Sequence, residues 1–128
     1  MTRYKILIVD DEEYLRILLR DNLELEDFEV VAASTGKEAI EMAWKTCPDL
    51  AIIDIGLPDM TGWEVCRRLK EDFRSADLPI VILTAETAGK VGAQMKELGI
   101  THHIAKPYHP IEIITFLKDL LTKSTKDG

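Results

Sequence analysis

An apolar run of strand length, Tyr4-Lys5-Ile6-Leu7-Ile8-Val9, stops abruptly at two carboxylates, Asp10-Asp11. Three later apolar runs also end at a polar residue that can bind or react: 50–53 ends at Asp54, 79–83 at Thr84 and 102–105 at Lys106. If these runs are neighbouring parallel strands, their carboxyl ends meet at one edge of a sheet. Carboxylate, hydroxyl and ammonium groups would then lie close together.

Strand-length runs alternate with segments of helical periodicity along the whole chain, which favours an α/β domain with a parallel sheet. The expected strands are 4–9, 29–33, 50–53, 79–83 and 102–105. The expected helices are 13–26, 36–46, the segment from loop 54–62 to about 72, 86–97, and the segment after Pro110. We therefore expect a flavodoxin-like doubly wound (βα)5 fold: a five-stranded parallel sheet of order 2-1-3-4-5 with helices on both faces.

Two of the expected helices carry further signals. After Pro110 the apolar residues fall in one broad arc, which predicts a helix packed on the core. They are Ile113, Ile114, Phe116, Leu117, Leu120 and Leu121. The helix at 86–97 contains Gly89 and Gly92, each of which costs it about 1 kcal/mol relative to alanine. We expect this helix to be the most mobile element.

Composition narrows the class of protein. The 128 residues are 46% hydrophobic and 30% charged, as in one folded domain, which we expect over 1–123 with a polar tail at 124–128. The net charge of -7 argues against direct nucleic-acid binding, because phosphate backbones would be repelled. No apolar run approaches the roughly 20 residues that span a bilayer, and no export signal is visible. We expect a cytoplasmic location without membrane contact.

The expected sheet brings the acidic groups within reach of one another. Adjacent strands lie about 4.8 Å apart, so Asp10 and Asp11 end one spacing from Asp54. Thr84 ends one spacing away on the other side of Asp54, and the long side chain of Lys106 can cover two spacings. Carboxylates this close repel one another unless a cation intervenes, and Mg²⁺ suits an all-oxygen site.

Such a site is suited to phosphoryl transfer. A metal ion and Lys106 would together neutralise a phosphoryl group arriving at Asp54, where an acyl phosphate could form. Phosphoryl transfer depends on positioning and charge neutralisation more than on a dedicated acid or base. A catalytic histidine or serine constellation is therefore not required.

Four fragments of the sequence resemble the receiver domain of the bacterial two-component response-regulator family. They are Ile8-Val9-Asp10-Asp11-Glu12, Asp54 with Leu57-Pro58 and Gly62, Thr84-Ala85, and Lys106-Pro107. Each fragment alone is a weak signal, but the four together, in this order and spacing, are highly specific. The resemblance covers essentially the full length of the chain. The chain is similar to single-domain regulators of the chemotaxis type.

The resemblance implies a phosphoacceptor signalling domain of a phosphorelay. Asp54 would receive a phosphoryl group from a phosphohistidine on a histidine kinase or a histidine phosphotransfer protein. Asp11 and Asp54 would ligate Mg²⁺ with the backbone carbonyl of Gly56, and Asp10 would help, often through water. The domain would not be an enzyme in the usual sense, but it would assist its own Mg²⁺-dependent phosphorylation and dephosphorylation.

The resemblance also assigns the residues that respond to phosphorylation. Thr84 would donate its hydroxyl to a phosphoryl oxygen, Lys106 would pair with the same group, and the Lys106-Pro107 peptide bond would be cis. The switch would change the face formed by the fourth helix, fifth strand and fifth helix, which binds a downstream output protein or domain. At the switch position the family usually carries an aromatic tyrosine or phenylalanine, and here His103 suggests a pH-sensitive or weakened switch.

Gly56 and Glu86 match positions that tune the lifetime of the phosphoryl group in the family. A glycine at position 56 leaves room for an attacking water, so we expect appreciable self-dephosphorylation. Asp59, in the turn after Asp54, is expected to serve the turn rather than the metal.

Other classes of protein fit less well. A flavin-binding module needs a glycine- and hydroxyl-rich phosphate cradle after the first strand, where residues 10–13 are acidic. A phosphatase of the haloacid dehalogenase type would need a second aspartate at position 56, which is glycine. An inert receiver-like interaction domain stays open, as does a receiver that is part of a larger regulator or hybrid kinase.

Overall fold

A computed structural model describes residues 3–85 and 88–126 and contains one five-stranded parallel sheet in the order β2-β1-β3-β4-β5. The strands are β1 (Lys5–Val9), β2 (Glu29–Ala33), β3 (Leu50–Asp54), β4 (Ile80–Thr84) and β5 (His102–Ala105). The helices are α1 (Glu13–Leu25), α2 (Gly36–Thr46), α3 (Gly62–Glu71), α4 (Ala88–Leu98) and α5 (Pro110–Lys126). This is the flavodoxin-like doubly wound fold that the sequence predicts.

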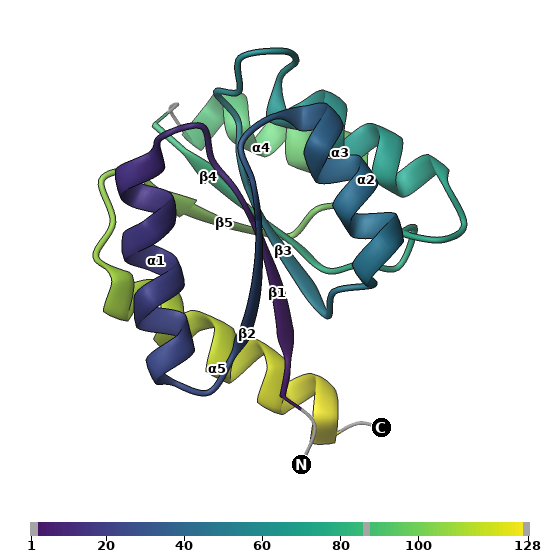
Figure 1. Cartoon of the computed structure of the whole chain (residues 1–128). Helices are drawn as coiled ribbons and strands as arrows, with labels where there is room; N and C mark the ends of the chain where they lie inside the picture. Colours follow the sequence, from purple (N-terminus) through teal and green to yellow (C-terminus); the bar gives the residue numbers. More distant parts are fainter. Residues whose placement is uncertain (1–2, 86–87, 127–128) are drawn as a thin grey trace.

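Helices cover both faces of the sheet: α1 and α5 lie on one face, and α2, α3 and α4 on the other (Figure 1). Alternate residues of β1 enter the two apolar layers, because successive side chains of a strand point to opposite faces. Leu7 and Val9 belong to the layer under α2, α3 and α4, whereas Ile6 and Ile8 belong to the layer under α1 and α5. A central strand covered on both faces must therefore be apolar throughout.

The parallel register brings the carboxyl ends of the strands to one edge. Asp54 pairs with Leu83, and Thr84 pairs with Ala105. The hydrogen bonding continues past the last strand, where the Lys106 N–H donates to the carbonyl oxygen of Thr84 at 2.8 Å. The polar residues that follow the strands are thereby fixed beside one another.

The predicted elements are confirmed, with small differences at their ends. Asp54 and Thr84 are the last residues of β3 and β4 rather than the first residues beyond them. Helix α5 continues through Lys126, so residues 124–126 of the expected polar tail are helical. No proline or glycine interrupts the sequence before Gly128, and extending an existing helix is easier than starting one.

The predicted apolar arc of α5 faces the core. Ile113, Ile114, Leu117 and Leu121 are buried there, and Phe116 and Leu120 pack against them partly buried. The 3.6-residue period alone was sufficient to identify this surface.

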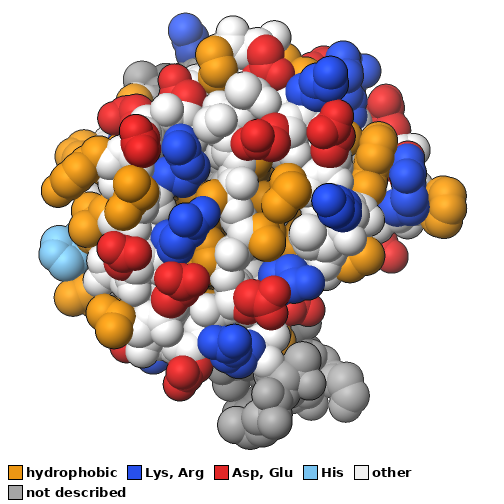
Figure 2. Space-filling view, in the orientation of Figure 1, with side chains coloured by type: hydrophobic (Ala, Val, Ile, Leu, Met, Phe, Trp, Pro, Cys, Tyr) orange, Lys and Arg blue, Asp and Glu red, His pale blue; other side chains and the backbone are white. Residues whose placement is uncertain are grey.

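Acidic and basic side chains are interspersed on the face of the molecule seen in Figure 2. Some pair along one helix, as where Glu64 accepts from Arg68 at 2.9 Å and also pairs with Arg67. Exposed pairs of this kind contribute little because water and salt screen them, so the two apolar layers provide most of the stability. Among residues 3–85 and 88–126, no helix combines the length and apolar character needed to cross a membrane.

Gly92 is an exposed residue of α4, and a Cβ atom added there would meet no described atom within 4 Å. We expect Gly92→Ala to raise the free energy of unfolding by about 0.5–1 kcal/mol, because alanine loses less backbone entropy on folding. Urea denaturation followed by circular dichroism measures the change. Gly62→Ala is the matched control and should destabilise, because its Cβ would lie 2.7 Å from the Cα of Ile55. A Gly92→Ala variant less stable than the parent would contradict the expectation.

Candidate functional site

A hollow of about 420 Å³ opens at the carboxyl edge of the sheet, where the predicted site residues lie. Its lining residues are Asp11, Glu12, Asp54, Ile55, Gly56, Thr84, Ala85 and Lys106. They come from the ends of β1, β3, β4 and β5 and from the turns that follow. Segments far apart in the sequence therefore form one site because the strands are parallel and in register.

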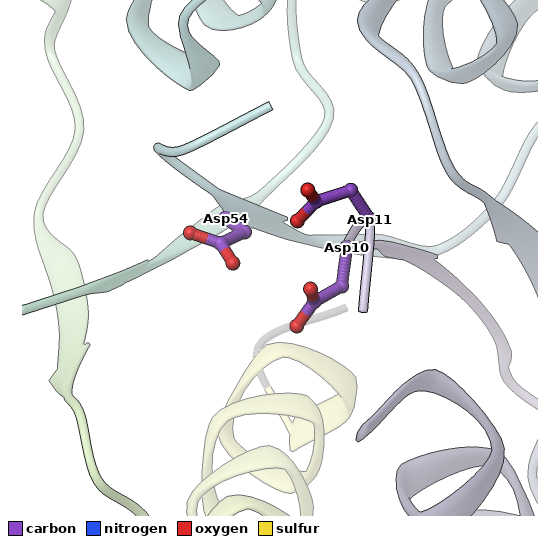
Figure 3. A group of neighbouring side chains, drawn as sticks. All are labelled: Asp10, Asp11 and Asp54. Carbon is purple, nitrogen blue, oxygen red and sulfur yellow. The ribbon is translucent and has the colours of Figure 1, made fainter. Parts of the chain in front are cut away.

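Three carboxylates gather at this hollow. One oxygen atom from each of Asp10, Asp11 and Asp54 lies within 4.8 Å of the others. In Figure 3, Asp10 and Asp11 follow the end of β1 and lie beside Asp54 at the end of β3. Asp10 and Asp54 are only 1% and 5% exposed, whereas Asp11 is exposed. A cluster of carboxylate oxygens at this separation can hold a divalent cation.

Asp10 is the most deeply buried carboxylate of the cluster. Its Oδ1 accepts a hydrogen bond from the Glu12 N–H at 2.9 Å, but its buried Oδ2 has no hydrogen-bond partner among the described residues. Burial raises the pKa of Asp10 from 3.8 to about 6, against the lowering effect of the Glu12 N–H, and the charge of Asp54 adds to the rise. An unpartnered buried oxygen is costly, and a bound cation would satisfy it. The donor set of this cluster therefore fits Mg²⁺.

Asp54 is held from two sides. Its Oδ1 accepts a hydrogen bond from the Gly56 N–H at 3.0 Å, and its Oδ2 forms an ion pair with the ammonium group of Lys106. Burial acts to lower the pKa of Lys106, but the hydrogen bond and charge of Asp54 outweigh it, so the pKa is raised and the ammonium form is favoured. The carboxylate is thus oriented, with a fixed positive charge beside it.

Thr84 ends β4, is 2% exposed and lines the hollow beside Lys106. The Lys106-Pro107 peptide bond is cis, as the resemblance implies. His103 is exposed on β5, opposite Ile82 in the register, and does not line the hollow. Glu86 lies outside the described residues.

The structure thus brings most of the predicted site residues together at one edge of the sheet and leaves His103 on the surface. Those brought together are Asp10, Asp11, Asp54, Gly56, Thr84 and Lys106.

Sequence reasoning missed two residues near this site. Arg16 donates from Nη1 to the backbone carbonyl of Asp10 at 2.8 Å, which holds the turn after β1. A cation in the first turns of a helix is unfavourable for the helix dipole, and this was the available signal. Tyr108 has a buried hydroxyl with no partner among the described residues, and burial, with the nearby negative charges, raises its pKa to about 12.

A family model described as the response regulator receiver domain matches residues 6–118. The chain belongs to this family of receiver domains. It is 38% identical over 120 residues to the alkaline phosphatase synthesis transcriptional regulatory protein PhoP of Bacillus subtilis, a match that covers 94% of this chain and 49% of PhoP. Receiver domains belong to two-component signalling systems.

Two other receiver sequences show the range of proteins in which such domains occur. The chemotaxis protein CheY4 of Vibrio cholerae is 30% identical, with a TM-score of 0.87 over 92% of this chain and 98% of that one. Histidine kinase P4 of Formosa agariphila is 34% identical over 116 residues, which cover 91% of this chain but 8% of the kinase. The chain spans about half the length of PhoP and nearly the whole of CheY4.

We expect Asp10→Asn to change how stability depends on pH in the absence of metal. Because folding raises the pKa of Asp10 from 3.8 to about 6, the folded wild type binds a proton more readily than the unfolded chain. The contribution of Asp10 to stability therefore grows as the pH falls from about 6 to about 4, by up to about 3 kcal/mol, and is lost as the pH rises again. Asn has no such contribution.

Urea denaturation of both proteins with EDTA, at about pH 7 and about pH 5, measures this difference. At about pH 7 the variant should be the more stable protein, and its advantage should shrink at about pH 5. Carboxylates distant from Asp10 titrate equally in both proteins, so the difference reports Asp10 together with its interaction with the charge of Asp54. If the variant were more stable than the wild type by the same amount at both pH values, burial would not raise the pKa of Asp10 as described.

Proposed function

We propose that Asp54 accepts a phosphoryl group from a phosphohistidine on a histidine kinase or histidine phosphotransfer protein, in a reaction that requires Mg²⁺. The observation that carries this proposal is the setting of Asp54: a buried, oriented carboxylate beside an ammonium group and next to a carboxylate oxygen that lacks a partner among the described residues. Such a site attracts both a cation and an anion.

The transfer uses the chain's own groups for positioning. The carboxylates of Asp10, Asp11 and Asp54 and the backbone carbonyl of Gly56 would hold Mg²⁺, which when bound supplies positive charge to the phosphoryl oxygens. An oxygen of Asp54 forms the new O–P bond as the N–P bond of the phosphohistidine breaks, and the electron pair of that bond returns to the imidazole. Lys106 exchanges its ion pair with Asp54 for one with a phosphoryl oxygen.

The same residues would pass the signal onward. In this proposal the Thr84 hydroxyl donates to a phosphoryl oxygen. The movement of Thr84 then shifts the populations of two conformations of the surface made by α4, β5 and α5. His103 lies exposed on β5, and in this proposal it would influence the binding of an output protein. The domain promotes its own phosphorylation and dephosphorylation but does not turn over a separate substrate.

The partner that receives the signal is proposed here only as a class of protein. The surface of α4, β5 and α5 would bind an output protein, or an output domain if the receiver belongs to a larger regulator or a hybrid kinase. PhoP is named as a transcriptional regulator and P4 as a histidine kinase, so both arrangements occur among relatives. The proposal includes the cytoplasmic location expected from the sequence.

Incubation with acetyl phosphate and Mg²⁺ tests the acceptor. We expect the chain to gain the mass of one phosphoryl group, with the modification on Asp54, because among the described residues of the hollow it is the carboxylate paired with an ammonium group. Asp54→Asn should abolish the gain, and EDTA should prevent it. Asp21→Asn, which changes an exposed carboxylate on α1, is the control and should be modified like the parent. An unmodified parent chain would favour the inert receiver-like domain instead.

The lifetime of the acyl phosphate depends on the space beside Asp54. Gly56 is exposed, and a Cβ atom at this position would lie 3.9 Å from Asp54 Oδ1 without a clash. We expect Gly56→Met to lengthen the half-life of the phosphorylated form, since its side chain would obstruct an attacking water. Gly56→Ala should have a smaller effect. Loss of radiolabelled phosphate with time measures the half-life, and equal half-lives for the parent and Gly56→Met would exclude this role.

A further inference from the structure

The start of α2 is capped by a carboxylate that is distant in the sequence. The Gly36 and Lys37 N–H groups donate to Oδ1 and Oδ2 of Asp59 at 2.7 and 3.0 Å. The next N–H, of Glu38, donates to Oγ1 of Thr35 at 3.1 Å. The N–H groups of the first helical turn, which a helix cannot satisfy internally, are thus shared between a local residue and a residue of the β3–α3 loop.

The β3–α3 loop carries Gly56 at one end and Asp59 at its tip. The base of the loop is closed by the Gly62 N–H, which donates to the Ile55 carbonyl at 2.8 Å, and by a bridge between Gly56 and Thr61. The tip is attached to α2, which lies beside α3 on the same face of the sheet (Figure 1). Asp59 therefore ties the loop to a second helix.

The residue after Asp59 also packs tightly against the start of α2. Gly36 lies directly against Met60, and a Cβ atom at Gly36 would stand only 2.8 Å from Met60 Sδ. A side chain at position 36 would require the Met60 side chain to move. Hydrogen bonds and packing together hold residues 59 and 60 at one place.

We propose that Asp59 is a positioning residue for the metal site, an inference that rests on the proposed function. Gly56 lines the hollow, and as a glycine it has a wide range of backbone conformations that must be restricted before its carbonyl can serve as a ligand. The bonds at the loop base restrict one side of this segment. Asp59 restricts the other side, by fixing the tip of the loop to α2.

A role confined to capping α2 makes different predictions. Thr35→Ala removes a side-chain acceptor from the same helix start but leaves the loop attached through Asp59. Asp59→Ala removes both the cap and the attachment. Asp59→Asn keeps an acceptor oxygen for one of the two N–H groups. Its Mg²⁺ affinity and amide exchange rates should therefore lie between those of the parent and of Asp59→Ala.

The experiment compares the full chain and these three variants by calorimetric Mg²⁺ titration and by amide hydrogen exchange without metal. We expect Asp59→Ala to weaken Mg²⁺ binding about tenfold, the lower end of the range for residues that orient metal ligands, with Asp59→Asn in between. The amides of Gly56 and Gly62 should exchange faster in Asp59→Ala. Thr35→Ala should lower the urea midpoint but leave the Mg²⁺ dissociation constant and these two amides unchanged.

Three results would overturn the inference. If the parent binds Mg²⁺ and Asp59→Ala binds it equally well, Asp59 is a helix cap alone and the proposed function stands. If Thr35→Ala weakens Mg²⁺ binding as much as Asp59→Ala does, the effect comes from α2 and not from the loop. If the parent itself binds no Mg²⁺ and is not phosphorylated, the proposed function fails and this inference fails with it. If Asp59→Ala does not fold, the same measurements on Asp59→Asn and Thr35→Ala are compared, and they test the inference in its place.

Discussion

Burial of carboxylates at the edge of an otherwise apolar sheet is the constraint on which the rest of this structure depends. Helices cover both faces, so polar groups can gather only where the strands end. Asp10 and Asp54 each have one oxygen satisfied in the same way, since Oδ1 of each accepts a hydrogen bond from the N–H two residues further along the chain. Their second oxygens differ: Lys106 pairs with that of Asp54, while that of Asp10 has no partner in the described part of the chain. This imbalance of charge is what a cation and a phosphoryl group would complete.

The fold and the main site were predictable because they use the strongest signals in a sequence. Apolar runs identify β1, β3 and β4, and a parallel sheet with right-handed crossovers leaves few ways to arrange them. Once the strands are adjacent, the residues at their ends must meet. Asp54 and Thr84 could therefore be assigned to one edge before any contact was known, and the structure places both beside the hollow.

The unpredicted features depend on single contacts without a periodic pattern. Asp59 accepts from backbone groups 23 and 22 residues away, and no local spacing reveals such a pairing. Arg16 bonds a backbone carbonyl only six residues before it, but this contact also follows no periodic pattern. His103 follows another histidine, so the sequence alone does not show which of the two faces the core. In the structure His102 stacks edge-on against Phe116 of α5, which leaves His103 exposed. The sequence alone does not fix the end of α5, because polar residues predict a tail as readily as a solvated last turn.

The shared use of Asp59 by two elements has a consequence for engineered chimaeras. The loop at 55–61 and the start of α2 are separate in the sequence but complete each other's hydrogen bonds. Transplanting the loop alone into another sheet would deliver a carboxylate without its two amide donors. It would also leave the methionine at position 60 facing whatever side chain replaces Gly36. The smallest segment that can be exchanged as a unit is therefore discontinuous, and joins residues 35–37 with residues 54–62.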